Sequence, residues 1–303
     1  MNCRSILLGS LLLAPSLVFA ELHVVIVEGL GGDPAYAEQF SQQVSAIQAA
    51  SSALTDTRNI QVFRPDTASR DAILKHFTTL ASQLSANDSI SVFLIGHGSY
   101  DDVEYKFNIA GPDLTGEDIA GSINALASTS QLFVNTSSAS GATFDLLQKD
   151  GRILILATRS GVERHATRFG AYFADALSNA TADTDKNKLI SVAEAFGFAE
   201  RQVADYYESN GQLATEHPRM DGDRTSRMTL ARLASSRPTI IDVALAELIA
   251  DRDTLNNDID ELRLARDDMG LPDYQAQLLD KILQLARIED AIEAREENLG
   301  VQD

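Results

Sequence analysis

Cysteine is nearly absent from this sequence. The 303 residues contain one cysteine, Cys3, and the chain from Arg4 to its end has none. That part of the chain therefore has no disulfide bond, no thiolate metal ligand and no thiol nucleophile.

Positive charge is also scarce. The sequence has 25 Lys and Arg against 44 Asp and Glu, which gives a formal net charge of -19. A surface this acidic repels phosphate groups, and no cluster of basic residues with interleaved aromatic residues occurs along the chain. We therefore expect the protein not to bind nucleic acid.

A long apolar stretch occurs only at the N-terminus. Arg4 precedes an apolar core that starts at Ile6, and the segment ends in Val-Phe-Ala at Ala20. This arrangement predicts a secretory signal peptide over residues 1–20. The stretch is interrupted by Pro15 and is too short to span a bilayer comfortably. We expect an exported protein, periplasmic or secreted, with no membrane span after removal of the signal peptide.

Apolar runs alternate with amphipathic stretches between residues 21 and 223. Five short runs are rich in β-branched and aromatic residues: 23–27, 60–63, the first parts of 89–99 and 131–141, and 152–158. Strands in this alternation with helices predict an α/β domain, in which right-handed crossovers build a mostly parallel sheet sandwiched by helices. With 44% hydrophobic residues, the chain can bury such a core.

Two of these runs end in small polar residues. The run ISVFLIGHGS places His97 between two glycines, and the run QLFVNTSSASG carries Ser137, with Ser138 and Ser140 after it. Functional sites of open α/β sheets lie at the carboxyl ends of the strands. We therefore expect an imidazole and a hydroxyl side by side at this edge, with the Ser137 Oγ within hydrogen-bonding reach of His97.

Five core strands, with His-Gly after the third and a turn of small residues after the fourth, resemble the caspase and legumain group of cysteine peptidases. The resemblance covers about residues 21–207. It implies a caspase/legumain-like fold and places His97 at the catalytic histidine of that family. In the segment NTSSASG it places Ser137 where the catalytic cysteine belongs. It also implies that the loop with Arg159 and Glu163 forms part of a substrate pocket.

The exchange of cysteine for serine changes the expected chemistry. A serine hydroxyl needs a base that a third, buried group holds in place, whereas a cysteine thiolate is itself nucleophilic. Asp101 and Asp102 follow His97 in a polar loop, which is a poor place for such a group. The sequence favours a catalytically degenerate protein that binds a protein or peptide partner in the peptidase cleft. The alternative is a serine-dependent peptidase or esterase with Ser137 as nucleophile and His97 as base.

A calcium-binding loop is predicted at residues 183–194. Oxygen donors recur at the first, third, fifth, seventh, ninth and twelfth positions, as in an EF-hand-type loop. They are Asp183, Asp185, Asn187, the backbone of Leu189, Ser191 and Glu194. The sixth position is Lys188, where glycine is expected. In the alternative interpretation, Ser191 and Glu194 form only a capping box at the start of the next helix.

The composition changes near the C-terminus. Residues 224–238 are predicted to be a linker, and Leu and Ile then recur at intervals of three and four through residues 239–303, with a break at Gly270-Leu271-Pro272. This pattern predicts an antiparallel, coiled-coil-like helical hairpin. The segment holds 17 Asp and Glu against 6 Lys and Arg, a net charge of -11. Its apolar seam must be buried against a partner. That partner is its own second helix, the α/β domain, or a second copy of the chain through self-association.

Overall fold

The computed structural model describes residues 20–233, 242–264, 266 and 269–299. All but the last residue of the predicted signal peptide lies outside the described residues, as do residues 234–241, which hold the end of the predicted linker.

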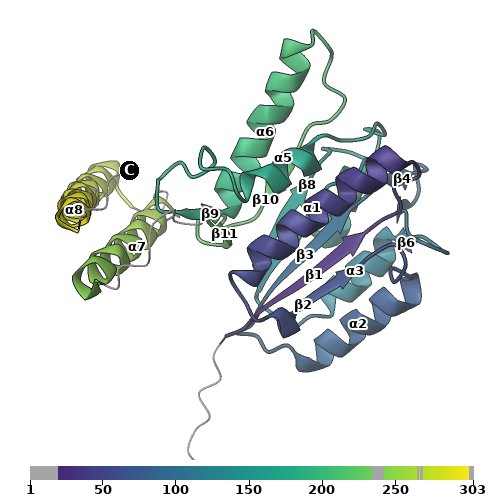
Figure 1. Cartoon of the computed structure of the whole chain (residues 1–303), viewed down its shortest axis with the longest axis horizontal. Coiled ribbons are helices and arrows are strands. Elements are labelled where there is room, and N and C mark those ends of the chain that lie inside the picture. Colours follow the sequence, from purple (N-terminus) through teal and green to yellow (C-terminus); the bar gives the residue numbers. More distant parts are fainter. Residues whose placement is uncertain (1–19, 234–241, 265, 267–268, 300–303) are drawn as a thin grey trace, which may run out of the picture.

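The core of the protein is a six-stranded sheet in the order β10-β8-β7-β3-β1-β2 (Figure 1). Five strands are parallel to one another: β1 (Leu22–Glu28), β2 (Ile60–Phe63), β3 (Ser89–Ile95), β7 (Ser130–Asn135) and β8 (Arg152–Leu156). The sixth strand, β10 (Arg219–Asp221), pairs antiparallel with β8. The sequence does not predict β10, because a strand of three half-buried residues in a turn-rich segment carries no periodic signal.

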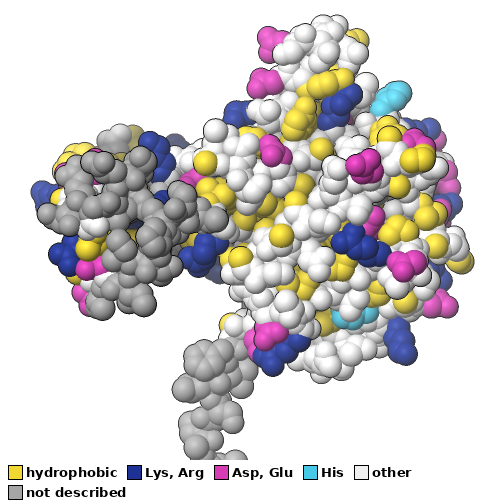
Figure 2. All heavy atoms as spheres, in the orientation of Figure 1, with side chains coloured by type: hydrophobic (Ala, Val, Ile, Leu, Met, Phe, Trp, Pro, Cys, Tyr) yellow, Lys and Arg dark blue, Asp and Glu magenta, His cyan; other side chains and the backbone are white. Residues whose placement is uncertain are grey.

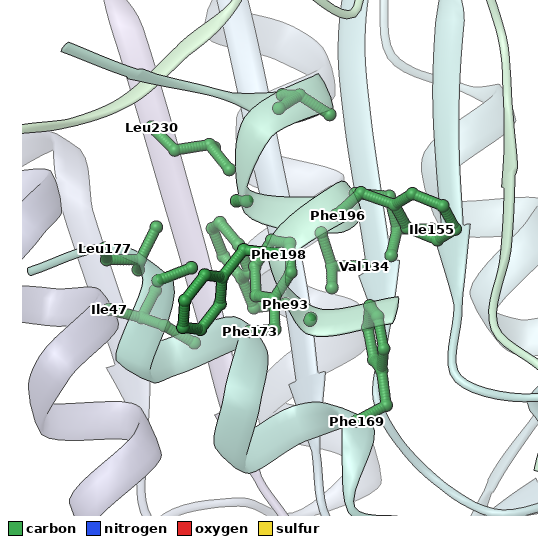
Figure 3. Close-up of a cluster of buried hydrophobic side chains, with 14 of the residues drawn as sticks. Ile47, Phe93, Val134, Ile155, Phe169, Phe173, Leu177, Phe196, Phe198 and Leu230 are labelled. Atoms are coloured by element: carbon green, nitrogen blue, oxygen red, sulfur yellow. The ribbon is translucent and has the colours of Figure 1, made fainter. Parts of the chain in front are cut away.

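One face of the sheet is covered by α1 (Pro34–Ser52), α5 (Phe169–Ala176) and α6 (Val192–Ser209). Figure 3 shows Phe169, Phe173 and Phe196 from these helices against the strand residues Val134 and Ile155. Burying large aromatic side chains of this kind stabilises the fold by roughly 2–3 kcal/mol each. These contacts fix the strands whose ends form the candidate site.

The opposite face is covered by α2 (Arg70–Gln83), α3 (Gly116–Asn124) and the short α4 (Phe144–Leu147). Successive strand residues point to opposite faces of the sheet. Val24 therefore packs in the core on the α1 side, and Val25 packs in the core on the α2 side. Both faces are therefore apolar. This explains why the strands appear in the sequence as uninterrupted apolar runs rather than as alternating patterns.

Side chains satisfy free backbone N–H groups at the starts of several helices. Asp33 accepts hydrogen bonds from the first turn of α1, and Thr115 forms a capping box with Asp118 at α3. At α5 the carboxylate comes from far along the chain, because Glu216 accepts the N–H groups of Arg168 and Phe169. Glu216 is 1% exposed, and burial raises its pKa. This residue therefore ties the segment before β10 to the start of α5.

A small antiparallel sheet follows His97 where a polar loop is expected from the sequence. It consists of β4 (Gly98–Tyr100), β5 (Tyr105–Phe107) and β6 (Leu114–Thr115). The loop expectation is correct for Asp101, Asp102 and Glu104, which form the β4–β5 turn. It is wrong for Tyr105, because Tyr105 and Phe107 are buried against the α2 face of the core, which holds β5 in place. Short 3₁₀ segments, η1 (Thr57–Asn59) and η2 (Ser140–Thr143), complete the connections.

A second small sheet involves the predicted linker. β11 (Thr229–Arg232) pairs antiparallel with β9 (Leu189–Ser191), which lies inside the predicted calcium loop. The linker prediction over residues 224–238 is therefore wrong for this part. Leu230 and Ala231 are buried in the core on the α6 side, so the segment is part of the α/β domain.

Two long helices form the C-terminal hairpin: α7 (Val243–Leu264) and α8 (Leu271–Asn298). Lys281 pairs with Asp258 and Arg295 pairs with Asp242, which sets the helices antiparallel. Leu255, Ile259 and Leu262 of α7 are buried. The predicted α/β class, with a mostly parallel sheet between helices and a C-terminal hairpin, is confirmed. None of the described helices is long and apolar enough for a membrane crossing.

Candidate functional site

His97 and Ser137 both lie at the carboxyl edge of the central sheet. His97 follows β3 and Ser137 follows β7, and these two strands are neighbours in the sheet. The sequence therefore predicts the common edge of the two residues correctly. Their side chains, however, bond to different partners.

Ser137 belongs to a closed cycle of hydrogen bonds, which we call the Ser137 cluster: Tyr105, Asn135 and Ser137. The Ser137 Oγ donates to the Asn135 Oδ1 at 2.8 Å, and the Asn135 Nδ2 donates to the Tyr105 hydroxyl at 2.9 Å. The Tyr105 hydroxyl lies 2.6 Å from the Ser137 Oγ and closes the cycle. Ser137 and Asn135 are 0% exposed. The hydroxyl of Ser137 is thus both bonded and shielded from solvent.

Tyr105 is the member of this cluster that the sequence does not reveal. It reaches the site from β5, a strand of three residues, and burial raises the pKa of its phenol to about 12. It stays neutral at physiological pH and acts as a hydrogen-bond donor. The available signal was its position within an otherwise polar loop, which is insufficient to place a buried ring.

His97 points into a different environment. Its Nε2 lies 3.1 Å from the carbonyl oxygen of Gly31, and its ring makes edge contacts with Tyr36 and Phe40 of α1. Within the described part of the chain, no hydrogen bond joins His97 to Ser137. The expected hydrogen bond between the two side chains is thus not formed, and the Ser137 Oγ bonds to Asn135 and Tyr105 instead.

The glycines around His97 have a steric reason. A Cβ atom at Gly98 would lie 2.5 Å from the Ser137 Oγ and 2.7 Å from the Ser138 carbonyl oxygen. A Cβ atom at Gly96 would lie 2.9 Å from the Phe107 ring. Because only glycine permits such close approach, the Gly-His-Gly motif is explained by packing of β4 and β5 over the Ser137 cluster.

The acidic residues after His97 serve the β4–β5 turn and its surroundings. Asp101 accepts the N–H groups of Val103 and Glu104, which lower its pKa to about 2 together with Lys106. Asp102 pairs with Arg164 at 2.6 Å. Neither carboxylate is hydrogen-bonded to His97 in the described chain, so the group bonded to that imidazole is the Gly31 carbonyl and not Asp101 or Asp102.

The loop after β8 holds a carboxylate–imidazole pair of its own. Glu163 accepts a hydrogen bond from the backbone N–H of Arg159 and lies 2.9 Å from the His217 Nδ1. His217 is about half-exposed. The pair ties the loop after β8 to the segment before β10, which is a structural role for Glu163.

Exposed apolar side chains surround this edge. Leu30, Val103 and Val162 are 41%, 89% and 71% exposed, and we call them the edge surface. Their loops are linked: Leu30 N–H donates to the Asn108 carbonyl beside β5, and Tyr100 packs on Gly161.

The second candidate site is the loop of residues 183–194. One oxygen from each of Asp183, Asp185 and Glu194 lies within 4.8 Å of the others. Lys186 and Lys188 adopt left-handed backbone conformations, with φ of 58° and 65°. The backbone at the sixth position thus makes the turn that glycine usually makes, although the residue is lysine.

The side chains of this loop also form a capping box. Glu194 Oε2 accepts from the N–H and hydroxyl of Ser191, and Glu194 Oε1 accepts from Thr184. The capping box named in the alternative interpretation is therefore present, since Ser191 caps α6. Asn187 Oδ1 accepts the N–H of Leu189, which folds the loop on itself.

Negative charge nevertheless accumulates in the loop. Burial, and then the charges of Glu194 and Asp183, raise the pKa of Asp185 to about 6. Burial also acts on Glu194, but hydrogen bonds from Ser191 and Thr184 outweigh it and lower that pKa. The donor set consists of hard oxygen atoms at separations that fit a cation with oxygen ligands at about 2.4 Å, as for calcium.

Comparison with known proteins gives the following results. No family model matches the chain, and no curated protein matches it. Among solved structures it is similar to protein GSU0716 from Geobacter sulfurreducens, with a TM-score of 0.46 and 11% identity over 71% of this chain and 100% of that one. It is also similar to caspase-1 from Spodoptera frugiperda, with a TM-score of 0.46 and 13% identity over 72% of this chain and 92% of that one. At TM-scores below 0.5, these similarities say nothing about activity.

Proposed function

We propose that this chain is an exported, caspase/legumain-like protein without peptidase activity, which binds a protein or peptide through the loops at the carboxyl edge of its sheet. The proposal takes the family resemblance from the order of the strands and from the places of His97 and Ser137.

The state of the Ser137 hydroxyl carries this proposal. A serine nucleophile must reach its substrate and must pass its proton to a base within about 3 Å. Ser137 is 0% exposed, donates a hydrogen bond to Asn135 and lies beside the neutral phenol of Tyr105. Since none of these partners is a base at neutral pH, the hydroxyl stays protonated.

The alternative function, a serine-dependent peptidase or esterase, requires a rearrangement of this edge. Ser137 would have to leave the Ser137 cluster and come within reach of His97. Asn135 and Tyr105 would stay bonded to each other but would each lose one hydrogen bond, at a cost of roughly 0.5–1.5 kcal/mol for each bond.

A fluorophosphonate probe distinguishes the two functions. The chain from Glu21 to Asp303 should show no labelling above that of its His97→Ala variant, with an active serine hydrolase as positive control. Labelling that maps to Ser137 and disappears in His97→Ala would establish the serine hydrolase and contradict our proposal.

The binding role requires its own test on the edge surface. Peptides selected from a displayed library against the intact chain should bind Val162→Asp about tenfold more weakly, a loss of about 1.4 kcal/mol. Leu213→Asp is the matched control, because Leu213 is 91% exposed outside the edge surface. Equal affinity for wild type and Val162→Asp would place the binding site elsewhere.

We further propose that residues 183–194 bind calcium. The convergence of Asp183, Asp185 and Glu194 supports this, as does the raised pKa of Asp185, because a divalent cation would relieve the repulsion. Asn187, the Leu189 carbonyl and Ser191 occupy the remaining positions of the EF-hand pattern. The oxygen atoms of Ser191 and Glu194 would have to bind the ion in addition to making the capping hydrogen bonds.

Calcium titration of thermal unfolding tests this site. An affinity of about 10⁻⁴ to 10⁻³ M at 10 mM calcium would stabilise the native state by roughly 1.4–2.7 kcal/mol. Asp183→Ala should abolish the rise in melting temperature. Asp205→Ala, on the exposed side of α6, should retain it. A wild type that does not respond to calcium would leave only the capping function.

A further inference from the structure

Helix α8 exposes apolar side chains that neither α7 nor the α/β domain covers. Leu279, Ile282 and Leu283 are 59%, 45% and 50% exposed, and Ala286 is exposed as well. We call these four residues the outer stripe. Their spacing of three, four and seven places them on one face of the helix.

The outer stripe is distinct from the seam of the hairpin. Toward α7, the helix presents the half-buried Leu278 and Leu285, together with Lys281, which pairs with Asp258. The outer stripe lies beside this seam, and Ile282 and Leu285 border a cavity of about 640 Å³ between the hairpin and α6. The face is therefore continuous with an open groove.

The same face becomes acidic toward the C-terminus. Glu289, Asp290 and Glu293 follow Ile282, Leu283 and Ala286 at intervals of seven residues, and all three are exposed. The whole segment 239–303 has a net charge of -11. A helix that lies on the outer stripe thus meets apolar contacts first and negative charge one to two turns further on.

We propose that the outer stripe and its acidic continuation dock a basic amphipathic helix of a partner protein. A leucine-rich face would cover the outer stripe, and Lys or Arg would meet Glu289, Asp290 and Glu293. Helix-in-groove recognition uses apolar anchors at this spacing. A second copy of the chain fits less well, because it would bring another segment of net charge -11 to the same face.

The test uses designed peptides and the intact chain from Glu21 to Asp303. The probe is a fluorescent helix of about 18 residues, five turns, with Leu on one face and Lys elsewhere. One control peptide replaces Lys by Glu, and another scrambles the Leu and Lys positions. Anisotropy should report binding of the first peptide only, at least tenfold tighter than either control.

Two variants locate the site. Leu279→Gln with Leu283→Gln should weaken binding by at least tenfold, whereas Leu213→Gln should not. Asp290→Lys with Glu293→Lys should weaken binding and reduce its salt dependence. These residues are exposed, so circular dichroism and melting should match wild type.

Three outcomes would overturn this proposal. Equal binding of the scrambled peptide would reduce the effect to unspecific charge attraction. Equal binding by the outer-stripe variant would place the site elsewhere. A dimer in light scattering that Leu279→Gln with Leu283→Gln converts to a monomer would show that a second copy covers the face. None of these results depends on the function of the edge surface.

Discussion

The Ser137 cluster and the 183–194 loop are both polar sites on one α/β domain, but they differ in how their polar groups are satisfied. The cluster is neutral and fully buried, and its three side chains donate and accept in a closed cycle. The loop is partly exposed and holds three carboxylates within 4.8 Å of one another. Figure 2 shows basic, acidic and apolar side chains interspersed over one face of the molecule.

This difference separates a polar site that satisfies itself from the proposed ligand site. A buried neutral network that satisfies itself needs no ligand and stabilises one arrangement of the chain. Carboxylates held this close together gain free energy when a cation arrives. We therefore attribute the Ser137 cluster to folding and keep calcium binding by the 183–194 loop as a proposal.

The largest expected effect concerns Gly98. In Gly98→Ala a Cβ atom would collide with the Ser137 Oγ and the Ser138 backbone. We expect the free energy of unfolding to fall by about 3 kcal/mol, the upper range for overpacking. Gly121→Ala is the control, because Gly121 lies in α3 with open space around it, and it should stabilise by up to about 1 kcal/mol. Urea denaturation measures both free energies of unfolding. A Gly98→Ala protein as stable as wild type would contradict the claim that the Ser137 cluster is a tightly packed structural site.

A double-mutant cycle within the Ser137 cluster should give the next largest effect. Ser137→Ala and Tyr105→Phe each remove one hydroxyl from the cycle and should each cost about 1–2 kcal/mol. Since the two groups share a hydrogen bond, the coupling energy should be about 0.5–2 kcal/mol. Additive losses would show that the cycle does not act as a unit.

The strands of the central sheet could be predicted because each is buried on both faces. Ile90–Ile95 and Leu132–Val134 are apolar in every position except Ser91, and small polar residues mark where they end. The capping box of Ser191 and Glu194 and the hairpin break at Gly270 could also be predicted, since they depend on local sequence only.

The partners of His97 and Ser137 could not be predicted. Tyr105 comes from a strand of three residues, and the Gly31 carbonyl comes from a loop after β1, so both contacts are tertiary. A motif shows which side chains reach an edge of a sheet. It does not show which neighbours have already used their hydrogen bonds.

Asp118 is a carboxylate that is paired with a cationic side chain, Arg70. Arg70 donates two hydrogen bonds of 2.7 Å to Asp118, and this pairing lowers the Asp118 pKa. The stabilisation is present above the ordinary carboxyl pKa of about 4 and is lost as the pH falls through the lowered value. Asp118→Asn should therefore cost up to about 1 kcal/mol at pH 7. The cost should shrink in acid, whereas Asp205→Asn should show no such trend in denaturation from pH 7 to pH 3.

Asp185→Asn should have the smallest effect and the opposite sign. Without added calcium, the change removes repulsion with Asp183 and Glu194 and keeps an oxygen for the N–H of Asn187. We expect a gain of about 0.5 kcal/mol at pH 7, because solvent screens the exposed loop. A loss of stability in a calcium-free melt would mean that the carboxylates are already compensated.

The accessibility of position 137 tests the central claim most directly. The chain from Glu21 to Asp303 has no cysteine, so Ser137→Cys introduces a single thiol. Alkylation of the native protein by iodoacetamide should be at least about 100-fold slower than in Ser178→Cys, an exposed control, because a buried thiol reacts only on opening. Both variants should react equally in denaturant. If Ser137→Cys instead reacts faster than the control, and His97→Ala removes that advantage, then the two residues form a working dyad and the account is contradicted.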